Sequence, residues 1–422
     1  MKAMTVPHTV VPRTSYARRW PGGQAGFTLI EMLVAMAVML VVLGGVFQAF
    51  NPAQGTFQTQ PEVADLQQRL RVGTDRLYNG LVVAGAGVYS GSAVGALGNF
   101  FAPVLPYRIG RIDSDPARGV FFRDDAITIF HVPTTASQCT IRDRMPRPSA
   151  EVKVNAEPGC PAGRAYSLCG FEENMRVVIF DDTGSWDIFT ITEVQEEGLH
   201  LQHRLDNFSK AYDAGAVIAQ VNTDTYYWRQ NPGANTFQLA HYDSADTDVP
   251  LIDNVVGLRF EYLGEATPPV LRKPVTDPVG PWTSYGPKPP ALGVDMAAGD
   301  RWGPGENCTF QVDAATGTQV SRLVTLGPLG SLTPLTAAQL SDGPWCPDGN
   351  PPDAAFPNRY DADLHRIRQV HVTFRVQTGV AVLRGPAGIL FSRAGTGRSS
   401  DRWVPDQAVQ FDVTPRNLNL GR

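Results

Sequence analysis

Charged residues are scarce in this 422-residue chain, and positive charge is not in excess. Only 18% of the residues are Asp, Glu, Lys or Arg, against about 25% in an average globular protein. The net charge of −5 indicates no basic surface that could neutralise the phosphates of a nucleic acid. Apolar residues make up 43% of the chain, which is enough to build a packed core. We therefore expect a folded protein without a nucleic-acid partner.

The sequence also lacks the short motifs that mark common active sites. It has no Gly-Lys pair and hence no Walker-type phosphate loop, no Gly-x-Ser-x-Gly elbow and no His-Glu-x-x-His zinc motif. His200 and His203 lie three apart in a predicted strand, which puts them on opposite faces and argues against a shared metal ion. The acidic residues Asp243, Asp246 and Asp248 lack the glycine and closing glutamate of a calcium loop and are interpreted as a solvated turn. We expect no enzyme activity, no cofactor and no metal site.

One stretch near the N-terminus is almost free of charge, because Glu31 is the single charged side chain between Arg19 and Glu62. The 24 residues 27–50 are nearly all apolar. As a helix they would be about 36 Å long, which exceeds the roughly 30 Å hydrocarbon core of a bilayer. The preceding 26 residues contain four basic side chains and no acid, which predicts a single span with a cytoplasmic N-terminus. A carboxylate in such a span is a candidate functional residue, and the alternative is that it lies at the membrane interface.

The residues around Glu31 resemble a known processing signal. Gly26-Phe27-Thr28-Leu29-Ile30-Glu31, followed by the apolar run, is similar to the class III signal of type IV prepilins and pseudopilins. The resemblance implies that prepilin peptidase cleaves after Gly26, that the new N-terminal Phe27 is N-methylated, and that Glu31 acts in filament assembly. In a packed filament, the Glu31 carboxylate of one subunit would meet the Phe27 amine of its neighbour. This pairing would remove the cost of an unpaired buried charge and set the axial register.

Two other interpretations of the N-terminal segment stay open. One is a cleaved secretory signal, although such signals have a shorter apolar region, of about 7–15 residues, and a small-x-small cleavage site. The other is a plain anchor on a periplasmic binding or adhesive protein that never polymerises.

A second helical pattern follows the apolar run. Asn51-Pro52 is predicted to interrupt the helix, because proline removes a backbone donor and clashes with the preceding turn. Between residues 61 and 83, apolar side chains recur at helical spacing, and Gly85 is expected to stop the helix. We expect this apolar stripe to pack against a sheet. Its members are Val63, Leu66, Leu70, Leu77 and Leu81.

Beyond Gly85 the apolar pattern changes to period two, which is typical of antiparallel strands with one buried face. The alternation is clearest in residues 255–263 and 368–378. Two tracts rich in proline and glycine, about 264–305 and 327–358, are interpreted as loop insertions. The predicted strands are Ala126–Val132, Arg176–Phe180, Asp187–Val194, His200–Arg204, Ala216–Val221, Thr225–Arg229, Phe237–Tyr242, Val255–Leu263 and Arg368–Thr378.

These patterns predict an α+β fold, and the resemblance to type IV prepilins implies that it is type IV pilin-like. A long N-terminal helix, with a membrane-spanning half and an amphipathic half, would pack on an antiparallel β-sheet head that carries large loop insertions. The predicted parts are a leader (1–26), a transmembrane and filament-core helix (27–50), the amphipathic half of the helix (51–84) and a β-rich head (85–422).

Several downstream segments resemble PilW-type minor pilins in the same order. The resemblance implies a minor pilin that primes pilus assembly, lies in the tip complex and supports motility and adhesion. The implied partners are prepilin peptidase, the major pilin and other minor pilins, the inner-membrane assembly platform, a tip adhesin and inner-membrane lipid. The protein would lie in the inner membrane before assembly and on the pilus at the cell surface afterwards. J-type minor pseudopilins of type II secretion share much of this layout and are the alternative. The segments are Asp75–Gly85, Asp125–Phe130, Thr225–Gln230, Phe237–Ala240, Pro250–Tyr262, Arg366–Phe374 and Phe411–Asn417.

The chain has five cysteines and none of them form a Cys-x-x-Cys pair, which argues against zinc or thioredoxin-like chemistry. An exported head permits disulfides. Cys160 with Cys169 would close a short loop, and Cys308 with Cys346 would staple the second insertion. Cys139 would then be left over, and the alternative is that some of the five stay as buried thiols.

Overall fold

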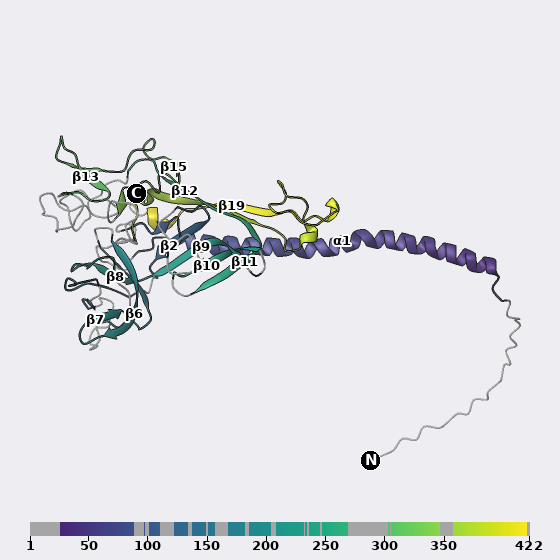
Figure 1. The fold of residues 1–422 in the computed structure, drawn as a ribbon, viewed down its shortest axis with the longest axis horizontal. Coiled ribbons are helices and arrows are strands. Elements are labelled where there is room, and N and C mark those ends of the chain that lie inside the picture. The colour runs from purple at the N-terminus through teal and green to yellow at the C-terminus, as the bar shows by residue number, and fades with distance from the viewer. Residues whose placement is uncertain are drawn as a thin grey trace, which may run out of the picture. The chain divides into compact units, whose positions relative to one another are not determined.

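The computed structural model divides the chain into two compact units, Met1–Gln58 and Thr59–Arg422 (Figure 1). A single helix, α1 (Leu29–Val82), contributes residues to both. The structure describes residues 26–87, 97, 101–109, 122–133, 137–148, 151–156, 168–181, 185–203, 208–231, 233, 236–244, 247–268, 303, 305–346 and 358–419. The predicted leader, apart from Gly26, therefore lies outside the described residues.

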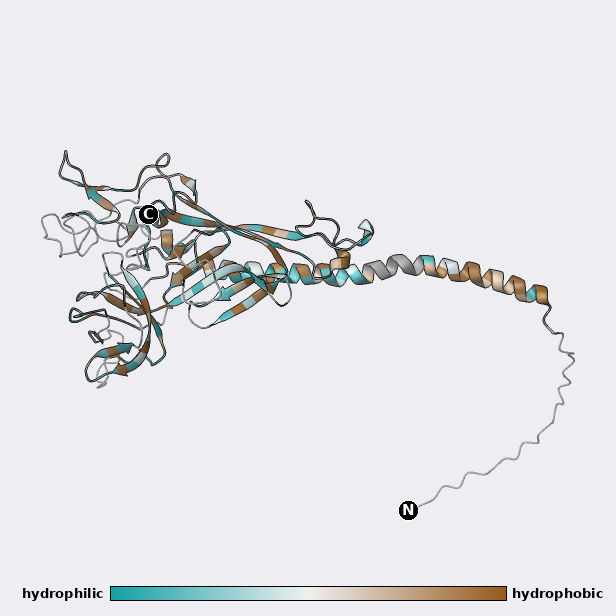
Figure 2. Cartoon of the chain, viewed as in Figure 1, coloured by the Kyte–Doolittle hydropathy of each residue, from teal (hydrophilic) through white to brown (hydrophobic). Residues whose placement is uncertain are grey.

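The first unit contributes the apolar part of α1. The segment Leu29–Gln48 has a mean hydropathy of 2.5, none of it is buried, and by length and composition it could cross a membrane. Figure 2 shows the hydrophobic colour on successive turns of this part of the helix. The predicted apolar N-terminal helix is confirmed.

The interruption predicted at Asn51-Pro52 is wrong, because α1 continues through both residues. A proline removes one backbone donor, and a helix can lose one hydrogen bond without ending. The predicted stop at Gly85 is confirmed, since α1 ends at Val82 and Gly85 has a φ of +73°. The Gly85 N–H donates to the Phe130 carbonyl at 2.8 Å instead of extending the helix.

The second unit is built on antiparallel sheets, which confirms the α+β class. Each predicted strand overlaps a strand of the structure. The five-stranded sheet has the order β1 (Val104–Leu105), β2 (Ala126–His131), β9 (Asn222–Asn231), β10 (Thr236–Tyr242) and β11 (Asp248–Asp253). The four-stranded sheet has the order β15 (Leu332–Leu335), β12 (Val255–Glu265), β18 (Ile367–Val376) and β19 (Gln407–Val413). The six-stranded sheet has the order β3 (Gln138–Thr140), β8 (Val217–Gln220), β5 (Arg176–Phe180), β6 (Trp186–Gln195), β7 (His200–His203) and β4 (Val152–Lys153).

Shorter elements complete the described part of this unit. Two small two-stranded sheets and four short 3₁₀ helices lie between or after the long strands. The two-stranded sheets are β13 (Phe310–Val312) with β14 (Gln319–Ser321), and β16 (Trp345–Cys346) with β17 (Tyr360–Asp361). The 3₁₀ helices are η2 (Ala362–Arg366), η3 (Ala381–Leu383), η4 (Ser400–Arg402) and η5 (Arg416–Asn419).

The second tract interpreted as a loop is only partly a loop. It contains β15, which pairs with β12 so that Pro334 lies opposite Leu263. Proline is compatible with this position because β15 is an edge strand and needs no donor on its outer side. Most of the first tract, residues 269–302, lies outside the described residues.

The α1 residues of the second unit are part of the main core. Leu66, Leu77 and Leu81 are fully buried, as the stripe predicts. The helix approaches the sheets closely at its glycines. A Cβ on Gly73 would lie 2.5 Å from the Phe374 ring, and one on Gly80 would lie 2.5 Å from the Tyr226 hydroxyl. These two positions fix how near α1 can pack to β18 and β9.

Candidate functional site at the N-terminal motif

No residue that the structure describes packs over the predicted cleavage position. Phe27 is 90% exposed, and no heavy atom lies within 4 Å of the position that a Cβ on Gly26 would occupy. Helix α1 begins two residues later, at Leu29, so Gly26 and Phe27 are not part of the helix. A protease that needs an extended backbone could therefore reach the Gly26–Phe27 bond.

Glu31 and Thr28 form a capping box at the start of α1. The Thr28 backbone N–H donates to Glu31 Oε2 at 2.9 Å, and the Thr28 hydroxyl donates to the same oxygen at 2.8 Å. In return, the Glu31 backbone N–H donates to Thr28 Oγ1 at 3.3 Å. Such reciprocal bonds satisfy backbone donors that the first turn of a helix leaves unpaired. The Thr-x-x-Glu spacing was visible in the sequence, but its capping role was not predicted.

The capping box determines how the Glu31 carboxylate is presented. The side chain is exposed, and its contacts to Thr28 all use Oε2. No partner of Oε1 occurs among the residues that the structure describes. The positive end of the helix dipole also favours a negative charge in this first turn. The carboxylate is therefore held at the helix start with one oxygen available to a cation.

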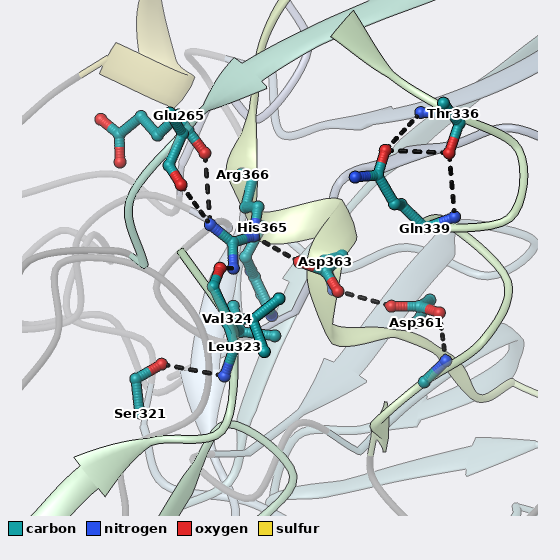
Figure 3. Close-up of polar contacts among 12 residues, drawn as sticks. Glu265, Ser321, Leu323, Val324, Thr336, Gln339, Asp361, Asp363, His365 and Arg366 are labelled. Carbon is teal, nitrogen blue, oxygen red and sulfur yellow. Dashed lines mark hydrogen bonds and ion pairs between the residues drawn. The ribbon is translucent and has the colours of Figure 1, made fainter. Parts of the chain in front are cut away.

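Sequence reasoning missed a second group of ionisable residues, which lies in the other unit. Asp342, Asp361 and Asp363 bring carboxylate oxygens within 4.8 Å of one another. Figure 3 shows Asp361 and Asp363 with Arg366, which follows them on η2. The Asp361 carboxylate accepts the Gly343 N–H at 2.6 Å and the Asp363 N–H at 2.8 Å.

Burial has the largest effect on the pKa values of Asp361 and Asp363 in this acidic cluster. Burial, opposed by its backbone hydrogen bonds, raises the pKa of Asp361 to about 7, and the neighbouring Asp363 adds to the rise. Burial also raises the pKa of Asp363, although the Arg366 guanidinium opposes this shift. Three carboxylates have the ligand chemistry of a divalent-cation site. Here, however, two of them are occupied by backbone N–H groups and by Arg366, so the cluster is accounted for by its own contacts.

Arg366 ties the cluster to distant segments. Its fully buried guanidinium pairs with Asp363 and donates to the carbonyls of Glu265, Ala266 and Val324 (Figure 3). The local signal in the sequence is an aspartate before a short helix, since Asp361 caps η2. The three carbonyl partners of Arg366 are 42 to 101 residues away, which no local pattern could reveal.

The cysteines occupy separate places in the second unit. Cys308 and Cys346 form a disulfide with a Cα–Cα distance of 5.2 Å. Cys169 is also disulfide-bonded, and Cys160, its expected partner, lies outside the described residues. Cys139 is buried in β3.

The histidines and aspartates set aside as metal ligands are found apart or in other contacts. His200 Nδ1 lies 3.5 Å from Glu151, whereas the His203 ring packs on Phe208 at 4.4 Å between centroids. The interpretation of Asp248 as part of a solvated turn is wrong, because Asp248 begins β11 and is 19% exposed. Its carboxylate accepts the Tyr227 hydroxyl at 2.9 Å and pairs with Arg229 at 2.6 Å.

The comparison with known proteins bears on the N-terminal motif. A family model described as the prokaryotic N-terminal methylation motif matches residues 22–47. No curated protein and no solved structure matches the chain. The matched residues include Gly26, Phe27, Glu31 and most of the apolar part of α1. The motif, an apolar N-terminal helix and a large antiparallel β-sheet domain together support a protein of the type IV pilin or pseudopilin type.

Proposed function

We propose that this protein is a PilW-like minor pilin that primes the assembly of a type IV pilus and lies in its tip complex. The observation that carries the proposal is the N-terminal site. An exposed Gly26–Phe27 junction precedes a helix whose first turn presents the Glu31 carboxylate. The order of the PilW-like segments along the chain supports the minor-pilin assignment.

Processing would create the second charge of the site. Prepilin peptidase would cut after Gly26 on the cytoplasmic face and methylate the new Phe27 amine. This amine would be a cation one residue before the Thr28 cap. The basic leader would stay in the cytoplasm, and residues 59–422 would be exported. Until assembly, the apolar part of α1 would hold the subunit in the inner membrane.

In the filament, Glu31 would pair with the Phe27 amine of the neighbouring subunit. The Oε2 atom is used by the Thr28 cap, so the amine would approach Oε1. Pairing would neutralise both charges in an apolar filament core, where either charge alone is costly. The head would contact the major pilin and other minor pilins, with the assembly platform and a tip adhesin as further partners. Its bulk and its insertions favour a tip position over a repeating shaft position.

Glu31→Gln is the variant that tests this role most directly. Glutamine can still accept the Thr28 N–H and keep the capping box, but it has no charge for a neighbouring amine. We expect Glu31→Gln and Glu31→Ala to be cleaved and inserted normally, yet to be depleted at least tenfold from sheared pili. Thr28→Ala removes the cap and keeps the charge, so it should reduce incorporation much less.

Three measurements could contradict the proposal. Normal incorporation of Glu31→Gln would show that Glu31 acts only as a helix cap. Mass spectrometry of the mature N-terminus should find methylated Phe27, and an uncut chain would favour a plain membrane anchor. A deletion strain with normal pili but blocked protein export would assign the subunit to a type II secretion pseudopilus.

A further inference from the structure

The segment between β18 and β19 exposes a short apolar run. Residues 386–390, which read Pro-Ala-Gly-Ile-Leu, are all exposed, and Ile389 is 95% exposed. We call residues 380–406 the basic-apolar loop and residues 386–390 its tip. Single exposed apolar residues are ordinary, whereas a consecutive run marks an interaction surface.

The tip is exposed, and hydrogen bonds and ring packing fix its conformation. The Gly388 N–H donates to the Phe391 carbonyl at 2.8 Å, which closes a turn around Ile389. The Arg375 guanidinium donates to the Ile389 carbonyl at 2.9 Å. Behind the tip, the buried Phe391 ring packs edge-on against Trp403 at 5.7 Å. The exposure of Ile389 therefore belongs to an ordered structure.

Arginines flank the tip in the sequence, and one of them, Arg393, stacks on the Phe237 ring at 4.3 Å. The basic-apolar loop contains four arginines and two aspartates, within a chain whose net charge is −5. Arg384 and Arg393 lie on either side of the tip in the sequence, and Arg398 is exposed. One of the two aspartates, Asp406, pairs with Arg375 of β18 at 3.0 Å. An apolar tip flanked by arginines is complementary to an anionic lipid surface, which combines apolar chains with negative headgroups.

The loop lies at the end of its unit where α1 enters. The Thr378 hydroxyl donates to Glu62 at 2.6 Å, and Gly73 faces Phe374, so β18 runs antiparallel to α1 toward residue 59. The apolar span ends at Gln48, and the intervening chain can extend over at most about 40 Å. A bilayer that holds the span is therefore within covalent reach of this end of the unit.

We propose that, before filament assembly, the tip of the basic-apolar loop inserts into the surface of an anionic phospholipid bilayer. Ile389 and Leu390 enter the interface between headgroups and acyl chains, and the arginines bind lipid phosphates. The contact holds the head on the membrane until the subunit is extracted. It rests on the membrane-held stage of the proposed function, and it does not involve Glu31.

A fluorescent reporter at the tip tests the proposal in the full-length chain. Ile389→Cys carries an environment-sensitive dye, and the protein is reconstituted through its own apolar helix. The vesicles contain phosphatidylcholine alone or with 30% phosphatidylglycerol, plus lipids brominated near the headgroup end of the acyl chains. We expect at least twofold quenching of the dye in the anionic vesicles and clearly less in phosphatidylcholine alone.

Leu329→Cys is the matched control, because Leu329 is also a strongly exposed apolar residue, at 81%, in a different loop of the same unit. It should show no quenching by the brominated lipid. Arg398→Gln should lower the quenching at residue 389 in anionic vesicles.

Three results would overturn the proposal. They are equal quenching at residues 389 and 329, equal quenching in both vesicle types, and protection of residue 389 only when a second subunit is added. The last result would identify a protein as the occupant. If Glu31→Gln subunits assemble normally while residue 389 is still quenched, the assembly role fails and the lipid contact stands.

Discussion

Two parts of α1 have the same backbone and opposite surroundings. In residues 29–48 the apolar side chains cover every face and none of the segment is buried, whereas in residues 59–82 Leu66, Leu77 and Leu81 are fully buried. The difference lies in the distribution of apolar residues, since a stripe can be covered by one sheet and a complete apolar surface cannot. The first part therefore needs lipid or other subunits, and the second part is satisfied within its own unit.

The two glutamates of α1 show the same contrast. Glu31 bonds only within its own helical turn among the described residues, whereas Glu62 accepts the Thr378 hydroxyl from the end of β18. A tertiary partner makes Glu62 part of the folded unit. The local partner of Glu31 leaves its charge available to another molecule.

Truncating one leucine in each part of α1 should give the largest difference in the free energy of unfolding. Leu77→Ala leaves a cavity in the core, so we expect a loss of about 2–5 kcal/mol in the free energy of unfolding. Leu33, which is 56% exposed, is the matched control, and Leu33→Ala should leave this free energy unchanged. Six of the seven tryptophans lie after residue 59, so denaturation in detergent followed by tryptophan fluorescence reports on the second unit. Equal losses for the two variants would break the comparison.

The free energy of unfolding of the second unit should depend on pH through Asp361. Burial raises its pKa to about 7 in the folded state, from an ordinary value of 3.8. The folded state therefore binds a proton that the unfolded chain has lost, and the stabilisation present below about pH 4 is lost as the pH rises through 7. The change is at most about 4 kcal/mol over that range.

Denaturant midpoints measured between pH 4 and pH 8 would test this dependence. Asp361→Asn should flatten the pH profile, although it also weakens one backbone hydrogen bond and lowers stability at all pH values. An unchanged slope would show that another group controls the titration.

Adding a methyl group at a helix glycine should change stability in the second part of α1 and leave it unchanged in the first. Gly73→Ala would place a Cβ 2.5 Å from the buried Phe374 ring, so overpacking should cost about 1–3 kcal/mol. Gly45 has no heavy atom within 4 Å of its Cβ position, so Gly45→Ala should leave the unfolding of the second unit unaltered. The readout is the melting temperature in detergent, and a stabilised Gly73→Ala would mean that helix propensity outweighs the steric contact.

The smallest expected effect concerns Glu62. Its carboxylate is partly exposed, so Glu62→Ala should cost only about 1 kcal/mol through loss of the Thr378 hydrogen bond. Glu31→Ala serves as the control and should leave the unfolding of the second unit unchanged. Thr378→Val also removes the acceptor of the Val380 N–H, so the double variant, measured by denaturant titration, should lose more than Glu62→Ala alone but less than the sum of the two single variants. Additive losses would show that the two side chains act independently.

Local periodicity explains which elements the sequence predicted well. The alternation in β12 and β18 indicates one buried face, and in the structure Leu258, Phe260, Val372 and Phe374 are buried. β19 is an edge strand that was not predicted, although it has the same alternation: Val409, Phe411 and Val413 pack against the core, and the residues between them are exposed. The break predicted at Pro52 failed because proline perturbs a helix without always ending it.

By itself the sequence determined the processing motif, the apolar helix, the leucine stripe and the main antiparallel strands, because each depends on spacing within a few residues. Only the tertiary structure decided which residues far apart in the chain meet. It brought Asp342 to Asp361, placed the Arg366 guanidinium against the Val324 carbonyl, and joined the Thr378 hydroxyl to Glu62. Such contacts depend on strand order and chain reversals, which no local pattern of residues encodes.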